Sequence, residues 1–171
     1  MWRKKTGGWI SLEVRLRGGE IIERFWRKSY TMEELRAISA VEQTVEHVCV
    51  KGCTAICNWK DVRLADLLKG IPRRPENRFV LFIYNDSFSG SRGYAPYAVT
   101  FDFKSALHPQ NLLAYEYNGE KLPFAHRVPL RLASSANVGR KSAKYISHIT
   151  LTNVDMGGYW ENQGYPCYYG L

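Results

Sequence analysis

The clearest folding signal in the chain is the stretch LLAYEYNGEKL, residues 112–122. Its centre, Asn118-Gly119, is a residue pair that favours a two-residue turn between antiparallel strands, because both turn positions require a positive φ angle. The apolar and aromatic residues before the pair predict one strand, and the residues after it predict the returning strand. The sequence therefore predicts a β-hairpin at this point.

Strand patterns also lie on both sides of this hairpin. Residues 10–17 alternate apolar and polar, and Gly18-Gly19 separates them from a returning strand over residues 20–26. The other expected strands cover residues 44–50, 79–84, 130–133 and 146–151. Most of the chain is therefore expected to form β-sheets.

Two short helices complete the expected elements. The first begins after Thr31, where Glu34 completes a capping box, and the second covers residues 61–68. Residues 85–96 are rich in Ser, Gly and Asp and predict a surface loop. Short strands with few helices predict an α+β fold with mixed β-sheets, in a single domain spanning residues 1–171.

The overall composition excludes several classes of protein. The chain has 171 residues, of which 45% are hydrophobic and 13% aromatic, so disorder is not expected. No apolar run approaches the roughly 20 residues that a membrane-spanning helix needs, so no membrane partner is expected. No signal-like block follows the basic N-terminal residues, which predicts a cytoplasmic protein with reduced thiols.

Positive charge is concentrated in one internal segment. The net charge is +8, and residues 121–145 contain six Lys and Arg residues and no acid. Such a block indicates an anionic partner, either nucleic acid or a small molecule that carries a phosphate, or else a solvated basic face. No helix-turn-helix or RNA-binding motif accompanies it, so nucleic acid is not the expected partner.

Within this segment, the side chains needed to bind an anion lie close together. Arg131 can form a bidentate contact with a phosphate, Lys144 adds a point charge, and Ser142 adds a hydroxyl. The spacing of a P-loop is absent. The segment therefore predicts an anion-binding site of another kind.

The cysteines form one cluster, Cys49, Cys53 and Cys57, with Cys167 far away. Four thiols could bind zinc or an iron–sulfur cluster, but the paired knuckles usual for such sites are absent. Cys53 and Cys57 are therefore expected to be small buried hydrophobic residues. Cys49 differs, because it lies where a strand ends at a turn and could present a soft sulfur ligand to a metal.

Several blocks of sequence, in order, resemble the oxidoreductase molybdopterin-binding domain family, which includes sulfite oxidases and catalytic subunits of bacterial protein-methionine-sulfoxide reductases. They are VEHVCVKG (45–52), WKDVRLADLL (59–68), LLAYEYNGEKLP (112–123), HRVPLRL (126–132), GRKSAKY (139–145) and GYWENQGY (158–165). The resemblance covers about residues 10–165. It implies the sulfite-oxidase-type molybdopterin-binding fold, in a minimal single-domain form without the haem and dimerisation domains of larger relatives.

The resemblance also implies a cofactor and its ligands. By position, Cys49 would be the thiolate ligand of molybdenum, and His126 and Arg131 would contact the pterin and its phosphate. Ser142 and Lys144 would close the phosphate pocket. The implied activity is a two-electron oxygen-atom transfer at the molybdenum centre of a bound molybdenum-molybdopterin cofactor.

Two of these assignments have simpler alternatives. Tyr97 matches the position where sulfite oxidases place a catalytic tyrosine beside the metal, but it could equally be a strand aromatic in the core. His126 could be an ordinary turn histidine.

Departures from the family pattern narrow the expected reaction. Asp61 replaces a Gly of the second block, and Arg127 replaces the Gly after His126. The arginine pair of the sulfite oxidase branch is also absent, and a dianion site needs such positive charge. We therefore expect a reductase-like enzyme with a small-molecule substrate and a redox partner protein. The alternative is a cofactor-free binding module of the same fold that holds an anionic ligand in a basic pocket.

Overall fold

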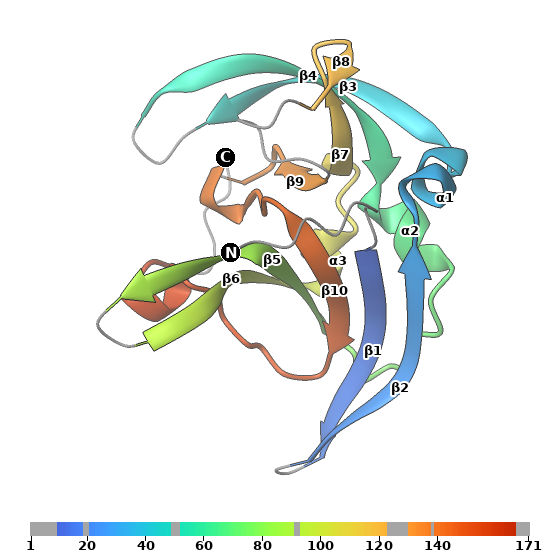
Figure 1. The fold of residues 1–171 in the computed structure, drawn as a ribbon, viewed down its shortest axis with the longest axis vertical. Coiled ribbons are helices and arrows are strands. Elements are labelled where there is room, and N and C mark those ends of the chain that lie inside the picture. Colours follow the sequence, from blue (N-terminus) through green and yellow to red (C-terminus); the bar gives the residue numbers. More distant parts are fainter. Residues whose placement is uncertain are drawn as a thin grey trace.

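The computed structural model describes residues 10–18, 21–48, 52–90, 93–122, 130–137 and 139–166. These residues form two β-sheets with short helices at their edges (Figure 1). The predicted α+β fold with mixed sheets is therefore confirmed.

The first sheet has five strands in the order β2-β1-β10-β5-β6. Their bounds are Ile10–Gly18 (β1), Ile21–Tyr30 (β2), Phe79–Gly90 (β5), Gly93–Asp102 (β6) and Ile146–Thr152 (β10). The sheet is mixed because β1 and β10 run parallel, while its other neighbouring strands run antiparallel.

The prediction of a surface loop over residues 85–96 is wrong. The described residues of this range, 85–90 and 93–96, belong to β5 and β6, which pair as far as Gly90 and Gly93. The pairing of β5 with β10 ends at Tyr84 and Ile146, so beyond that point β5 pairs with β6 alone. A two-stranded ribbon that extends past its sheet tolerates polar residues, and its composition therefore looks like that of a loop.

The second sheet runs in the order β3-β4-β7-β8, and β9 pairs with the first part of β7, on the same edge as β8. The strands are Ala40–Val48 (β3), Thr54–Arg63 (β4), Asn111–Tyr117 (β7), Glu120–Lys121 (β8) and Arg131–Ser134 (β9). The turn between β7 and β8 has positive φ angles at Asn118 (51°) and Gly119 (79°). The predicted hairpin is thus confirmed together with the backbone conformation that it requires.

The helices are short: Met32–Ala37 (α1), Leu64–Lys69 (α2), Phe103–Ala106 (α3), and the 3-10 turns Gly139–Lys141 (η2) and Glu161–Gln163 (η3). The capping box of α1 forms as predicted: the Glu34 amide donates to Thr31 Oγ1, and the Thr31 amide donates to the Glu34 carboxylate. The helix expected from residue 61 begins only at Leu64. The difference arises because Asp61 pairs with Ala114 in the second sheet and so keeps the chain extended.

The buried apolar residues form two clusters. The larger one joins the first sheet to one face of β7, which contributes Leu113 and Tyr115, and includes residues of α1 and α2. The smaller one contains Leu112 and Ala114, from the opposite face of β7. Because β7 is buried on both faces, some polar residues that pair with it are buried as well, namely Asp61 of β4 and Arg131 and Ser134 of β9.

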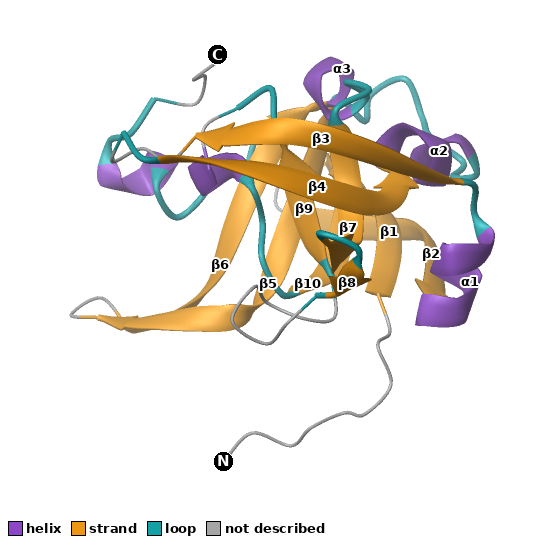
Figure 2. Ribbon diagram, turned by 90° about the horizontal axis from the view of Figure 1, so that it is seen from above, coloured by secondary structure: helices purple, strands orange, loops and turns teal. Residues whose placement is uncertain are grey.

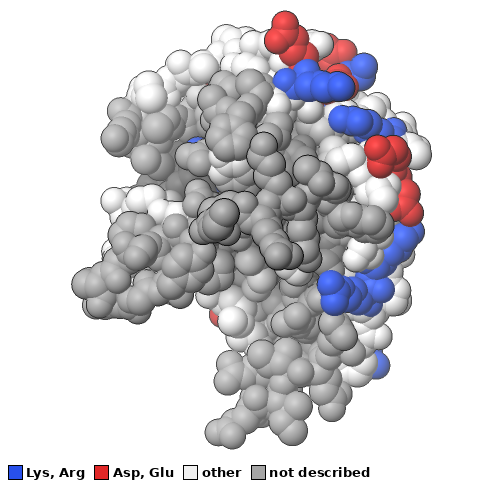
Figure 3. Space-filling view, viewed as in Figure 1, with Lys and Arg blue, Asp and Glu red and all other residues white. Residues whose placement is uncertain are grey.

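Figure 3 shows described charges of both signs along one edge of the molecule. Along the edge that carries β3, α1 and β2, the described Lys and Arg side chains are interspersed with Asp and Glu. This edge therefore carries mixed charge. No helix in the described residues is both long and apolar enough to cross a membrane.

Candidate functional site

Three of the predicted ligands lie on β9 and on the segment that follows it. We call residues 139–145 the basic turn. It is held to β9 by hydrogen bonds: the Leu132 amide donates to the Ala143 carbonyl at 2.7 Å, and the Ser134 amide donates to Ser142 Oγ at 3.3 Å. Figures 1 and 2 show that β9 belongs to the second sheet, next to β7. The structure therefore brings the strand of Arg131 and the turn of Ser142 and Lys144 side by side.

The basic turn also contacts the end of β3. A Cβ atom on Gly139 would lie 2.9 Å from His47 Nε2 and 3.3 Å from the Val48 carbonyl oxygen, so glycine permits this close approach. Burial lowers the pKa of His47, and the positive charges of Arg131 and Lys144 lower it further. Both cations are thus close enough to act on His47, although Lys144 is exposed and Arg131 is buried.

Two predicted ligands cannot be placed. Cys49 and His126 lie outside the described residues, so their predicted roles remain predictions. Val48, the last described residue before Cys49, lies against Gly139 of the basic turn.

Arg131 is a buried cation with unused hydrogen-bonding capacity. Only 5% of the residue is exposed, and its guanidinium lies over the Trp59 ring at 4.9 Å from the ring centroid. Arg131 Nε has no hydrogen-bond partner in the described part of the chain, and neither has Trp59 Nε1. Burial lowers the pKa of Arg131, although Asp61 is among the nearby groups that oppose this effect. Buried donors without acceptors are costly unless a ligand supplies the acceptor.

Asp61 is a buried acidic residue near Arg131. The strand register places Asp61, Ala114 and Arg131 in one row across β4, β7 and β9. Asp61 Oδ1 accepts a hydrogen bond from the Tyr115 amide at 2.7 Å, whereas its Oδ2 has no partner among the described residues. Burial raises the pKa of Asp61 to about 7, with a smaller contribution from Glu116 in the same direction.

Tyr97 belongs to an aromatic cluster on the first sheet. Its ring stacks on Tyr84 at a centroid distance of 6.1 Å and meets Tyr159 edge-on at 4.7 Å. Burial raises the pKa of Tyr84, as does Glu161, while Arg131 lowers it. The cluster therefore lies near Arg131, and Tyr97 is half-buried. A catalytic role for Tyr97 remains a prediction.

The two described cysteines behave differently. Cys57 is 4% exposed and packs in the smaller apolar cluster, as expected, and both thiols are free. The expectation that Cys53 is buried is wrong, because it is exposed in the turn that Gly52 makes with a φ angle of 82°. The described residues contain no group of three or more Cys, His, Asp or Glu side chains that could hold a metal ion.

Sequence reasoning missed two features of the site. One is His47, for which the sequence predicts no role, because nothing in the sequence shows that the basic turn packs against it. Lys141 looked like its basic neighbours, whereas in the structure it forms a buried ion pair with Glu161.

Taken together, the geometry defines a two-sheet α+β domain in which β9, the basic turn and the end of β3 form a candidate site for an anion. The chain belongs to the oxidoreductase molybdopterin-binding domain family, whose sequence profile matches residues 19–160.

Similarity to two other proteins supports this membership. The chain is 33% identical over 144 residues to a putative protein-methionine-sulfoxide reductase subunit, YedZ1, of Azospira oryzae, covering 84% of this chain and 52% of that one. It is 30% identical over 125 residues to the sulfite oxidase of Gallus gallus, covering 68% and 27% of the two chains. The chain thus spans about half the length of the first relative and less of the second.

A solved structure has the same fold. The crystal structure of the sulfane dehydrogenase SoxCD from Paracoccus pantotrophus matches with a TM-score of 0.67 and 17% identity, over 86% of this chain and 39% of that chain. The predicted sulfite-oxidase-type fold is therefore confirmed.

The described residues fit the phosphate of a molybdopterin. The buried Arg131 guanidinium, whose Nε has no partner among the described residues, lies on β9, and the buried Ser142 and the exposed Lys144 lie on the basic turn beside that strand. This donor set matches the oxygens of a phosphate group.

Proposed function

We propose that the chain is a molybdopterin-dependent oxidoreductase that transfers an oxygen atom and two electrons, acting as a reductase rather than as a sulfite oxidase. The observation that carries the proposal is the buried Arg131 guanidinium, whose Nε has no described partner, on the strand beside the basic turn. The alternative, a cofactor-free module with an anionic ligand, would use the same residues.

Each residue has a physical task in this proposal. Arg131 binds the phosphate through its planar fork of donors, and Lys144 contributes a point charge from the exposed side. Ser142 adds a hydroxyl, and His126 contacts the pterin. Cys49 supplies a soft thiolate to the metal. When bound, the cofactor supplies a molybdenum centre able to exchange an oxygen atom and two electrons with the substrate.

The proposed direction of the reaction has two supports. One is the similarity to the relative named as a putative protein-methionine-sulfoxide reductase subunit, which is 33% identical. The other is the absence from the sequence of the arginine pair expected in the sulfite oxidase branch. In this direction Tyr97 would lie beside the substrate, and a redox partner protein would supply the electrons.

The metal content of the purified protein tests the proposal. After expression in a host supplied with molybdate, we expect about one molybdenum and one pterin per chain, and loss of nearly all the molybdenum in Cys49→Ser because the thiolate ligand is gone. Elemental analysis and fluorescence of the oxidised pterin measure the two. Cys53→Ser is the matched control, because Cys53 is a nearby exposed thiol, and it should keep its metal. Wild-type protein without molybdenum or pterin would favour the cofactor-free module.

A further inference from the structure

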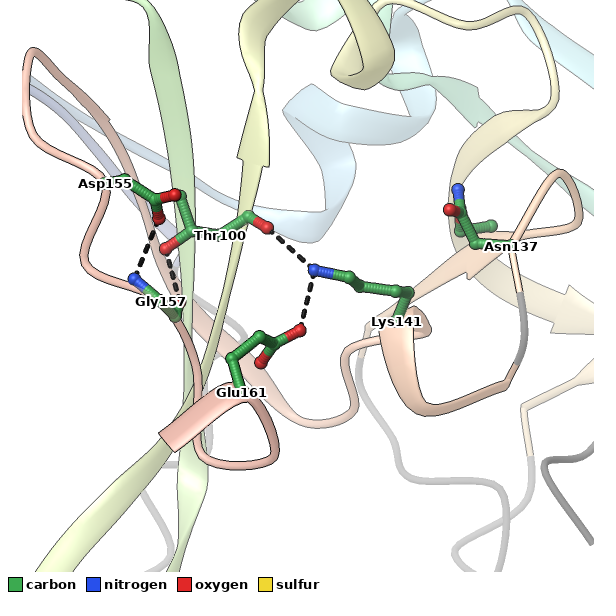
Figure 4. A network of polar contacts seen from close by, with 7 residues as sticks. Thr100, Asn137, Lys141, Asp155, Gly157 and Glu161 are labelled. Carbon is green, nitrogen blue, oxygen red and sulfur yellow. Dashed lines mark hydrogen bonds and ion pairs between the residues drawn. The ribbon is translucent and has the colours of Figure 1, made fainter. Parts of the chain in front are cut away.

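A buried ion pair links the basic turn to the C-terminal part of the chain. Lys141 Nζ lies 2.7 Å from Glu161 Oε1, and the two side chains are only 5% and 7% exposed. The same ammonium group donates a hydrogen bond to the Thr100 carbonyl of β6 at 3.1 Å. Figure 4 shows Lys141 reaching between Thr100 and Glu161. The turn that carries Ser142 and Lys144 is thereby tied to the first sheet as well as to β9.

The segment that presents Glu161 is itself fixed to β6. The Tyr159 amide donates to the Ala98 carbonyl at 3.1 Å, and Thr100 Oγ1 donates to the Gly157 carbonyl. A Cβ atom on Gly158 would collide with the Glu161 carboxylate and lie 2.9 Å from the Ala98 carbonyl oxygen. Glycine therefore allows the segment to lie close against β6, with the carboxylate of Glu161 beneath the basic turn.

These contacts do not form a ligand site of their own. Lys141 and Glu161 line a cavity of about 30 Å³ together with Thr100, Asn137 and Gly157. A space of this size holds a water molecule and is too small for a pterin, and the ammonium group of Lys141 that an anion would need is already paired with Glu161. The role of the ion pair must therefore be exerted through the backbone of the basic turn.

Stability alone is a weak reason for such a pair. Removing two charges from water costs about as much as their attraction returns, so a buried ion pair stabilises little compared with apolar side chains of similar size. A directional contact at a single point of the turn does, however, fix where the neighbouring residues lie. Ser142 follows Lys141 directly, and Lys144 is on the same turn.

We propose that Glu161 is a positioning residue, which acts through Lys141 to hold the basic turn in the geometry that binds the phosphate of the ligand. The inference rests on the proposed function only in taking a phosphate group as the ligand. It assigns a role to a carboxylate that does not itself touch that group.

The affinity for inorganic phosphate tests the inference when it is measured by isothermal titration calorimetry on full-length protein from a host that makes no molybdopterin, so that the site is not already filled by a pterin. We expect Glu161→Gln to bind phosphate roughly tenfold more weakly, as is usual when a residue that orients a ligand-binding group is lost. Simple electrostatics predicts the opposite, because removing a negative charge near the site would strengthen anion binding. In protein from a host that does make molybdopterin, the content of co-purified pterin should fall in parallel with the phosphate affinity.

Two further variants separate positioning from folding. Glu161→Gln leaves Lys141 buried without its counter-charge, so it could unfold the protein. The double variant Lys141→Met/Glu161→Met removes both charges and should keep a melting temperature close to that of the wild type. We expect it too to bind phosphate roughly tenfold more weakly, because apolar contacts do not fix the turn in one direction. Asp66→Asn is the control, since it removes an exposed ion pair with Lys69 of the same 2.7 Å length, and it should change nothing.

The outcomes distinguish this inference from the proposed function. If the wild type binds phosphate and the folded variants bind it equally well or more tightly, Glu161 is not a positioning residue, and the proposed function stands. If the wild type binds neither phosphate nor pterin, both fail together.

Discussion

As the pH rises from 4 to 8, the free energy of unfolding of the wild-type protein should fall relative to that of the Asp61→Asn variant. Burial raises the pKa of Asp61 to about 7 in the folded chain, from an ordinary value of 3.8. The folded state therefore holds a proton that the unfolded state releases, and stability falls as the pH rises through this interval. The contribution is fully present below pH 3.8 and is lost above pH 7. At 1.36 kcal/mol per pKa unit, the total is about 4 kcal/mol.

Asparagine suits this test because it has the shape of aspartic acid without its charge. Its carbonyl oxygen can accept the hydrogen bond that Asp61 Oδ1 takes from the Tyr115 amide. The charged group that raises the pKa beside Asp61 is Glu116 of β7, and the one that lowers it is Arg131 of β9. Both remain in the variant. We therefore expect equal stability near pH 4 and a variant more stable than the wild type at pH 8.

Urea unfolding at intervals of one pH unit measures the difference. Asp66→Asn serves as the control, because Asp66 pairs with Lys69 at the surface, and its profile should run parallel to that of the wild type. Parallel profiles for Asp61→Asn and the wild type would mean that Asp61 is ionised in the folded chain at neutral pH. The lack of a partner for Oδ2 among the described residues would then need an explanation other than a proton.

Features with local causes could be predicted from the sequence. The turn at Asn118-Gly119 and the capping box of Thr31 and Glu34 each depend on two residues close together in the chain, and both form as expected. Residues 85–96 were misjudged because their strand character comes from pairing between β5 and β6, which their polar composition hides. Residue 61 was misjudged for a related reason, since its partner Ala114 lies far away in the chain.

The candidate site was predictable to the extent that charge and resemblance could mark it. Arg131, Ser142 and Lys144 were identified from the acid-free segment and the family blocks, and the structure brings their segments together. The burial of Lys141 could not be foreseen, because it depends on Glu161 folding back beneath the basic turn. A sequence shows which residues are charged, but it does not show which of them form ion pairs in the folded chain.

Arg131→Met should bind inorganic phosphate at least roughly 100-fold more weakly than the wild type at pH 6, with little loss of stability. A hydrogen bond to a charged group contributes about 1.5–3 kcal/mol, so losing a two-donor fork costs about 3 kcal/mol or more, which is roughly a 100-fold change in affinity. Stability should hold because Arg131 is buried and its Nε has no described partner, so methionine removes a costly charge while filling the space over Trp59.

The stability expected of Arg131→Met depends on pH, because it depends on whether Asp61 is protonated. Below pH 7 Asp61 is mainly protonated, so removing the cation leaves no lone buried carboxylate beside it. At pH 8 Asp61 of the wild type is mainly ionised and Arg131 stabilises its charge, so the same substitution removes a favourable interaction and the variant should then be less stable than the wild type. The stability difference between Arg131→Met and the wild type should therefore change with pH, whereas the affinity difference should be present at both.

Two more variants serve as controls for the comparison of Arg131→Met with the wild type. Arg131→Lys keeps the charge but not the planar fork of donors, so its phosphate affinity should lie between that of the wild type and that of Arg131→Met. Arg73→Met is the matched control, because Arg73 also lies over an aromatic ring, that of Phe103 at 4.0 Å, but outside the site. Titration calorimetry and urea unfolding measure affinity and stability on the same samples, all from a host that makes no molybdopterin. Phosphate binding by Arg131→Met within threefold of the wild type would show that the buried guanidinium is not the anion ligand, because no described donor would replace its fork.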